Sequence, residues 1–523
     1  MDAARASALI AVATLALVWL GVVSGDSAAP LERYHLPKEL ALLVGTAAST
    51  LILALQRRAP SSLDALDGAA LVVVASGLLS SVGAVDGDVA LRLACLSGAG
   101  AALFLAVRAP AVPRVIVVSG VALVALAASA VVLGEALGLW PTLAPERLGP
   151  GGTLGQRNNA AHALALVAPL LAHELLRSQH ARRALLGAAL AAVVGAVLVT
   201  RSRAGWLALS VGGIGTLALQ VRSRGLRATL PALVAVALGL SVLLVSPALR
   251  WRSAHPYRDT ARALVDPSDR SAQGRRVQAS TSLRLWSAHP LLGVGPGHWA
   301  VHYPAVAEAD DPTVARETFR PTGRLMTSDL MALAVERGAV GLVALVALVA
   351  LWWRRRDPTE LWALPTAGAL LVLSALDCVL QIAMGACAAA LLAALAAPRS
   401  AAALARSWRA RGALLGLLAL LGLGAWRAAD RLLGQQAMGR ARSPEELAAV
   451  ARAHPAMLAP RVVLAERSLG TQDCAAALPW LEEIAARRPH WPHAVGQRNA
   501  CRARALGAQP DNAASGDGPP GAE

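Results

Sequence analysis

The sequence predicts an all-α fold, a polytopic bundle of about 12–13 transmembrane helices with a large periplasmic loop and a small helical C-terminal domain. Hydrophobic residues make up 56% of the 523 positions and charged residues 16%, and the mean hydropathy is +0.52. Apolar runs of about 17–24 residues recur along the chain, long enough to cross a hydrocarbon layer of about 30 Å as helices. The alternating polarity of membrane β-strands is absent from the sequence.

Hydropathy and arginine placement together give the expected topology. The first apolar run has no clear small-x-small cleavage site and is followed by further runs, so we read it as a span rather than a signal peptide. Arginines gather in alternate loops, for example Arg177 with Arg182 and the group at 354–356. Since basic residues stay on the cytoplasmic side, we expect a cytoplasmic N-terminus. The expected spans lie near 8–23, 40–56, 68–85, 89–107, 115–137, 160–176, 184–200, 204–220, 229–246, 329–353, 361–377, 379–397 and 412–428.

This topology divides the chain into five parts. Spans one to nine occupy 1–246, a large periplasmic loop occupies 247–328, and spans ten to thirteen occupy 329–428. A soluble helical domain at 429–506, with a tetratricopeptide-like arrangement as one option, then follows on the periplasmic side. Ser443 and Pro444 are expected to begin its first helix as N-cap and N1. The Gly/Pro/Ala-rich end at 507–523 is expected to be disordered.

The formal charge of +16 does not indicate a nucleic-acid partner. Every basic residue except Lys38 is arginine, and most of them sit in short clusters between apolar runs. The alanine and arginine excess is typical of a GC-rich bacterial genome, and the apolar spans are expected to be surrounded by membrane lipid. No cysteine or histidine spacing suggests a metal site. Cys474 and Cys501 can pair if the tail is periplasmic.

Two arginines follow the seventh expected span, at Arg201 and Arg203. Interfacial snorkelling beside Trp206 is one explanation for them. They lie, however, on the side that the positive-inside rule disfavours, which tilts the interpretation towards anion binding. Another segment, Gly152-Thr153-Leu154-Gly155-Gln156-Arg157-Asn158-Asn159, precedes span six; Arg157 and Asn158 are substrate-binding candidates, and a capped helix start is the alternative.

The large loop carries Arg275 and Arg276, followed by His289-Pro290-Leu291-Leu292-Gly293-Val294-Gly295-Pro296-Gly297-His298-Trp299. The glycine cluster lacks a Walker or Rossmann context, so on physical grounds it is a tight turn. Guanidinium groups from Arg203 and Arg275 together could clamp a diphosphate in a bidentate manner. Ser328 and Asp329 open span ten, either as a simple helix cap or as part of a site.

Taken in order, these four segments resemble the O-antigen ligase/Wzy polymerase superfamily of bacterial membrane glycosyltransferases, over roughly residues 150–345. The most specific part is 275–304, which looks like the family's periplasmic loop. The resemblance implies inverting glycan transfer from undecaprenyl diphosphate at the outer face of the inner membrane, with neither metal nor other cofactor. Arg203 and Arg275 match the family's arginines, which would hold the diphosphate and stabilise the leaving group.

The family's histidine at the entrance of span ten is missing, because Thr327, Ser328 and Asp329 stand where a His-Asn-Asp-like motif is expected. Asp329 is therefore the candidate general base, with His298 or His302 of the loop as alternatives. Arg276, Arg157, Asn158, His298 and Arg201 complete the predicted substrate site. The acceptor stays open between lipid A-core, as in lipopolysaccharide biosynthesis, another lipid-linked repeat, and a protein hydroxyl. A polysaccharide transporter or an assembly scaffold is the non-enzyme alternative.

Overall fold

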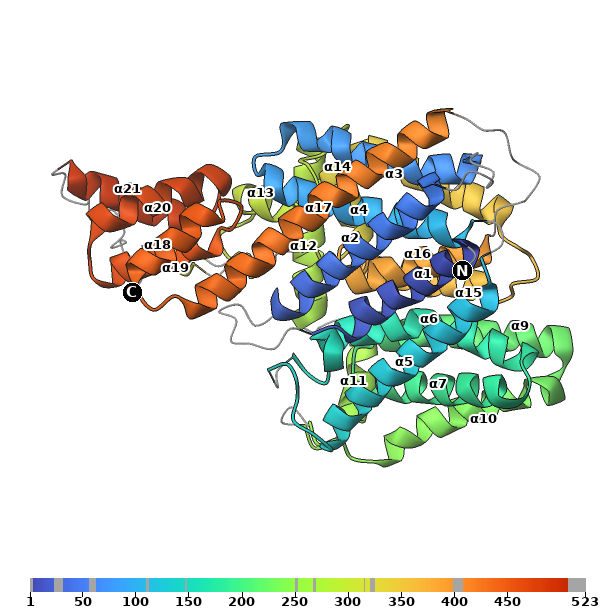
Figure 1. Cartoon of the computed structure of the whole chain (residues 1–523). Helices are drawn as coiled ribbons and strands as arrows, with labels where there is room; N and C mark the ends of the chain where they lie inside the picture. Colours follow the sequence, from blue (N-terminus) through green and yellow to red (C-terminus); the bar gives the residue numbers. More distant parts are fainter. Residues whose placement is uncertain are drawn as a thin grey trace. The chain divides into compact units, whose positions relative to one another are not determined.

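The computed structural model describes residues 3–22, 32–55, 63–109, 112–145, 148–249, 253–266, 270–314, 316–319, 325–397 and 408–506. Every regular element in these ranges is a helix (Figure 1), as predicted. The chain forms two compact units. One comprises Met1–Trp299 with Leu325–Gly439, and the other comprises Ala300–Arg324 with Arg440–Glu523. The predicted end segment 507–523 lies outside the described residues.

The first unit is the apolar bundle. Ten of its helices are long and apolar enough to cross a membrane, and three shorter apolar helices, Ala4–Leu20, Ala363–Leu376 and Ala383–Ala396, coincide with other predicted spans. Its helices are α1 Ala3–Leu20, α2 Glu32–Leu55, α3 Ala65–Ser80, α4 Gly87–Val107, α5 Arg114–Leu137, α6 Arg157–Arg177, α7 His180–Val199, α8 Arg203–Leu209, α9 Gly215–Arg224, α10 Leu226–Leu240, α11 Pro256–Val265, α12 Arg270–Ala288, α14 Asp329–Arg355, α15 Ala363–Leu376, α16 Ala383–Ala396 and α17 Trp408–Arg440. The helix α13 Trp299–Val306 begins in this unit at Trp299, and its remaining residues belong to the second unit.

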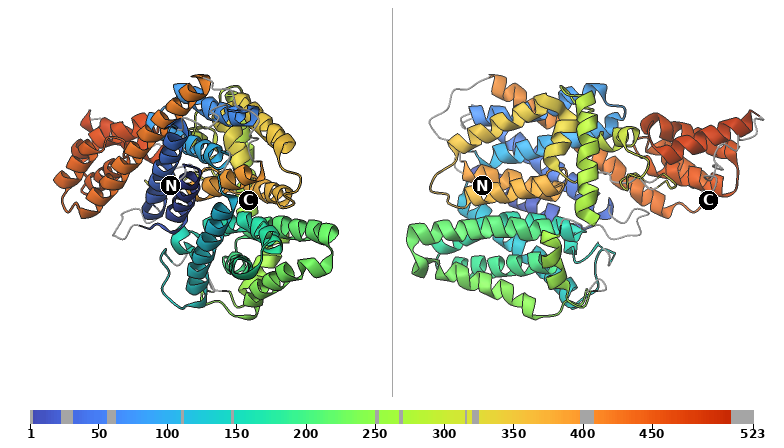
Figure 2. Two further views of the ribbon diagram at one scale, coloured as in Figure 1. Left: turned by 45° about the vertical axis from the view of Figure 1, so that its right-hand side comes forward. Right: turned by 180° about the vertical axis from the view of Figure 1, so that it is seen from behind.

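Two groups of helices make up the bundle (Figures 1 and 2). In one group α5, α6 and α10 all contact α7, and in the other α2 and α3 contact α4 while α3 also contacts α14. The helix α6 joins the groups through its contacts with α15 and α16, and its side chains from Asn159 to Leu175 are all buried. Apart from its ends, α6 is therefore shielded from the lipid, which makes its polar side chains candidates for function.

The predicted span 204–220 corresponds to a continuous helical stretch, Arg203–Arg224, which contains a π-type turn. A π-type turn at Ser210–Ile214 separates α8 from α9. A Cβ atom on Gly212 would lie 2.9 Å from Pro169 of α6 and 3.2 Å from Ala369 of α15, so glycine allows these helices to pack closely at the turn. Such turns often occur near functional sites, and this one lies on the helix that begins with Arg203.

The second unit consists of α18 Pro444–Ala453, α19 Ala459–Gly470, α20 Cys474–Arg487 and α21 Pro492–Ala505, each packed on the next in the chain. Ser443 caps α18 in a capping box with Glu446, and Pro444 is the first helical residue, as predicted. The two tail cysteines form a disulfide between α20 and α21.

The large loop predicted as one body is divided between the two units. Residues up to Trp299 belong to the bundle, whereas 300–324 belong with the tail. The physical reason is an aromatic side chain: Phe319 is 5% exposed and joins the core of the tail helices with Ile484 and Trp491. Its ring meets that of His493 edge-on, with centroids 4.5 Å apart. Hydropathy could not show which surface this phenylalanine covers.

Candidate functional site

The turn before α6 presents two of the predicted residues. Gly151 and Gly152 donate their N–H groups to the carboxylate of Glu135 on α5, at 3.0 and 2.8 Å. This anchor fixes the turn from which α6 starts at Arg157. Asn158, the next residue, donates from Nδ2 to Oδ2 of Asp377 at 3.3 Å. The segment thus works as a helix start and also directs a polar side chain towards α15.

Arg201 and Arg203 flank the break between α7 and α8. Arg201 has a left-handed backbone, φ +56°, and Ser202 caps α8 by accepting the N–H of Gly205. Both arginines reach α11 of the large loop. Arg201 donates from Nε to Thr260 at 3.1 Å, and Arg203 donates to the carbonyl of Ala263 at 3.0 Å. Burial lowers the pKa of Arg201, against an opposite influence from nearby Asp259 and Tyr257.

These arginines share one end of the bundle with Arg157. The charges of Arg201 and Arg203 both act on Arg157, and all three side chains are half-buried. A fourth guanidinium comes from α12, because the charge of Arg275 acts on His162 of α6. We call Arg157, Arg201, Arg203 and Arg275 the arginine cluster. Like charges held close together in a partly desolvated place are costly unless an anion binds between them. Arg276 is exposed on the same helix as Arg275.

Asp329 begins α14, behind Ser328 as N-cap. Its Oδ2 accepts the N–H groups of Val379 and Leu380 at 2.8 and 2.9 Å, and its Oδ1 accepts Nε2 of Gln381 at 3.1 Å. Both carboxylate oxygens are therefore used to hold the turn between α15 and α16. This geometry favours a positioning role for Asp329 over proton transfer.

The turn that Asp329 holds also carries Asp377. Asp377 Oδ2 lies 3.6 Å from Nε2 of His162, and Asp377 Oδ1 accepts the N–H of Cys378 at 2.9 Å. Sequence reasoning missed this pair. The available signals were His162, the first of two histidines in the apolar run of α6, and Asp377, the aspartate of an apolar turn.

The glycine segment of the large loop inserts into a break in α14. Gly338 interrupts that helix with φ +60° and ψ −159°. Around it, the N–H groups of Val294 and Gly295 donate to the carbonyls of Val335 and Glu336, both at 3.0 Å. A Cβ on Gly293 would lie 2.4 Å from the Glu336 carbonyl carbon, and one on Gly338 would lie 2.3 Å from the Leu291 oxygen. The glycines thus allow the backbone of this tight turn to lie in close contact with the backbone of α14.

His298, a predicted substrate ligand, ends this segment. Its side chain is fully buried, Nε2 accepts the N–H of Asp86 at 2.9 Å, and Nδ1 lies 2.9 Å from the carbonyl oxygen of Pro296. One neutral tautomer satisfies both contacts, with Nδ1–H as donor. The nearby Glu336 carboxylate accepts the N–H of Trp299 at 3.4 Å. These contacts give His298 a structural role, because they fix the glycine segment of the large loop in place.

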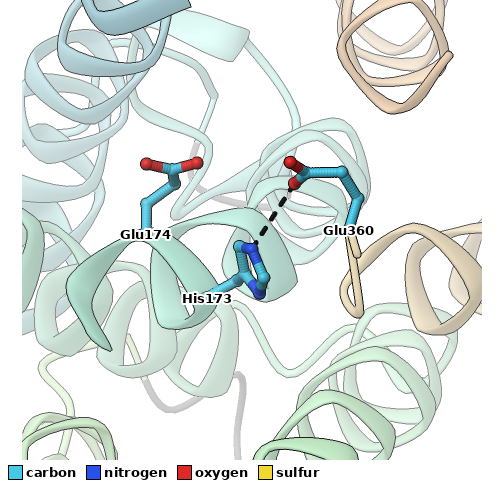
Figure 3. Close-up of side chains that lie close together, drawn as sticks. All are labelled: His173, Glu174 and Glu360. Carbon is cyan, nitrogen blue, oxygen red and sulfur yellow. Dashed lines mark ion pairs between the residues drawn. The ribbon is translucent and has the colours of Figure 1, made fainter. Parts of the chain in front are cut away.

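A separate polar cluster contains His173 and Glu174 of α6 and Glu360 (Figure 3), whose ligand atoms lie within 4.8 Å of one another. Three such groups could in principle hold a cation. However, Arg114 donates to Glu174 at 2.9 Å and to Glu360 at 2.7 Å, and Arg182 donates to Glu174 at 2.9 Å. Guanidinium groups already neutralise both carboxylates, so the chemistry fits an ion-pair network between helices rather than a metal centre.

The comparisons with known proteins agree with this arrangement. Residues 186–341 match the protein-family model described as O-Antigen ligase. The matched range contains Arg201, Arg203, Arg275 and Asp329, whereas α6 and the Asp377 turn lie outside it. No curated protein matches the chain. Residues 186–341 of this polytopic helical protein are therefore identified as an O-antigen ligase domain.

Proposed function

We propose that the protein is a membrane glycosyltransferase that moves a glycan from undecaprenyl diphosphate to an acceptor at the periplasmic face of the inner membrane. The observation that carries this proposal is the arginine cluster. Four guanidinium groups from α6, the α7–α8 junction and α12 gather at one end of an apolar bundle. The family match covers three of them and indicates a glycan-transfer enzyme.

The proposed role of the cluster is to bind the diphosphate and stabilise it as it leaves. Guanidinium forks bind phosphate oxygens in a bidentate manner, and the partly desolvated position strengthens each contact. When the bond between the anomeric carbon and the phosphate oxygen breaks, negative charge grows on the diphosphate. Arg203 and Arg275 then supply the electrostatic stabilisation, while Arg157, Arg201 and Asn158 border the same space. The residues of this chain supply all of these contacts.

The disulfide supports a periplasmic tail. Disulfides persist in the bacterial periplasm and are rare in a reducing cytosol. Cys474 and Cys501 are bonded, and they follow α17 in the chain. The start of α6, the end of α7 and the start of α14 lie at one end of the bundle, and the arginine-rich turn at 177–183 lies at the other. By the positive-inside rule the arginine cluster then faces the periplasm.

The acceptor in this proposal is the lipid A-core, as in an O-antigen ligase. Another lipid-linked repeat and a protein hydroxyl are the alternative acceptors, for a polymerase or a protein O-oligosaccharyltransferase. The family description favours the ligase. The reaction is the same in all three cases, so identifying the product decides between them.

The test uses cells that lack the gene, complemented with wild type, Arg203→Ala, Arg275→Ala or Arg284→Ala at matched protein levels. Arg284 is the matched control because it is exposed on the same helix as Arg275. We expect the first two variants to lose transfer by about 10²–10³-fold, as for removal of a transition-state contact. Their lipid-linked precursor should accumulate, whereas Arg284→Ala should behave as wild type.

Profiles of lipopolysaccharide, released polysaccharide and glycoproteins identify the acceptor from the product that is lost. If Arg203→Ala and Arg275→Ala both keep wild-type profiles, the transferase proposal is wrong. A scaffold or a polysaccharide transporter then becomes the better account.

A further inference from the structure

We propose that His162 is the general base of the transfer reaction and that Asp377 orients it. The inference rests on the proposed function and deepens it, because the sequence has no histidine at the start of α14, where Thr327, Ser328 and Asp329 stand. A base supplied from α6 would occupy the same end of the bundle as the arginine cluster.

The unusual feature of His162 is its lack of hydrogen bonds. The side chain is 2% exposed, and neither Nδ1 nor Nε2 has a hydrogen-bond partner. The two other buried histidines of the described chain differ. His298 contacts backbone groups through both nitrogens, and His173 contacts Gln220 at 2.6 Å and Arg177 at 3.2 Å. An unsatisfied buried polar group is costly and requires an explanation, and a catalytic role is one such explanation.

Asp377 is held in place to face this imidazole. Its Oδ2 lies 3.6 Å from His162 Nε2 and also accepts Nδ2 of Asn158 at 3.3 Å. Asn158 and His162 are four residues apart, so they lie on one face of α6. Asp329 in turn holds the backbone of Val379 and Leu380, two and three residues after Asp377. Asn158 and Asp329 are thus positioning residues that fix the carboxylate against the histidine.

The donor would bind next to this pair. The charge of Arg275 acts on His162, and α12 lies beside the start of α14, where Gln278 accepts the N–H of Thr327 at 2.9 Å. If Arg275 holds the diphosphate, the base and the leaving group share one space. General acid–base catalysis requires this proximity, because the base must reach the proton of the attacking hydroxyl.

The chemical step balances with these groups alone. The acceptor hydroxyl oxygen forms a bond to the anomeric carbon while its proton moves to a nitrogen of neutral His162. The bond from the anomeric carbon to the diphosphate oxygen breaks, and its electron pair stays on the diphosphate, facing Arg203 and Arg275. The Asp377 carboxylate stabilises the imidazolium, as in other aspartate–histidine pairs. The imidazolium then releases its proton to the departing diphosphate or to solvent, which regenerates the base.

The experiment uses purified full-length protein in vesicles, with the lipid-linked glycan extracted from the deletion strain as donor. The variants are His162→Ala, His162→Gln and Asp377→Asn, with exposed His180→Gln at the opposite end of the bundle as control. We expect His162→Ala and His162→Gln to lower kcat by about 10²–10⁴-fold with little change in the donor KM. Added imidazole should restore part of the activity of His162→Ala, and Asp377→Asn should lower kcat in the same direction.

Arg203→Ala in the same assay separates the two proposals. If Arg203→Ala is inactive while His162→Gln transfers at the wild-type rate, the base assignment is overturned and the proposed function stands. If His162→Ala instead raises the donor KM with kcat unchanged, His162 only shapes the donor site, and the inference is again wrong. If Arg203→Ala also transfers at the wild-type rate, the proposed function itself fails.

Discussion

At the scale of single residues, Asp329, the base predicted from the sequence, also anchors a turn of the structure. Its two oxygens accept three hydrogen bonds from the turn that follows α15. Hydrogen bonds to a charged group stabilise by about 1.5–3 kcal/mol each, so the turn depends strongly on this carboxylate. The half-buried Cys378 lies in the same turn, and the pKa of its thiol is raised well above the ordinary value by partial burial and by the carboxylate of Asp377.

This anchor gives a labelling prediction. At neutral pH the raised pKa leaves little Cys378 thiolate, so a maleimide should react slowly with wild-type protein. Asp329→Ala releases the turn, exposes the thiol and brings its pKa back towards the ordinary value, so labelling should accelerate at least tenfold, an order-of-magnitude expectation from thiolate fraction. Asp357→Ala is the control, because its carboxylate accepts from Thr359 in a different turn. Equal labelling rates in folded wild type and Asp329→Ala would contradict the anchoring role.

At the scale of elements, the helices of the tail pack against part of the large loop. The loop segment that contains Phe319 shares a core with α19, α20 and α21, and the disulfide fastens α20 to α21. The same loop runs from the anchored turn at Trp299 to the start of α14. The predicted soluble helical domain therefore packs against a segment of the large loop.

Phe319 is the residue to test for this packing. Replacing a buried phenylalanine with alanine costs about 3–5 kcal/mol, so Phe319→Ala should release the loop segment from the tail core. Limited proteolysis of the full-length protein should then cleave within 300–319 much faster than in wild type. Phe319→Leu, which keeps most of the apolar volume, should remain close to wild-type resistance. Protection of this segment in Phe319→Ala equal to that in wild type would show that other contacts hold the loop.

At the scale of the whole molecule, the sequence predicts the helices well but not the contacts between them. Hydropathy located the apolar spans, and the order of motifs located Arg203 and Asp329 at span ends and Arg275 in the large loop. The sequence could not predict the contact between Asn158 and Asp377, which are 219 residues apart. Periodicity shows which face of a helix is apolar, but it does not show which other helix packs against that face. The division of the large loop was hidden for the same reason, since long-range ring contacts of His302 and Phe319 with the tail accompany it.

Orientation is the property on which all the proposed chemistry depends. Ion pairs tie Arg114 and Arg182 to Glu174 at the end of the bundle opposite to the arginine cluster, as expected for a cytoplasmic face rich in arginine. Alkaline phosphatase folds only when exported, so a fusion after residue 506 should be active, and a fusion in the α6–α7 turn near Ser178 should be inactive. A fluorescent protein that matures only in the cytoplasm should give the opposite pattern at the same two sites. An active phosphatase near Ser178 together with an inactive one after residue 506 would mean that the arginine cluster and the tail face the cytoplasm. The Cys474–Cys501 disulfide would then be reduced, and the proposed transfer at the periplasmic face would be impossible.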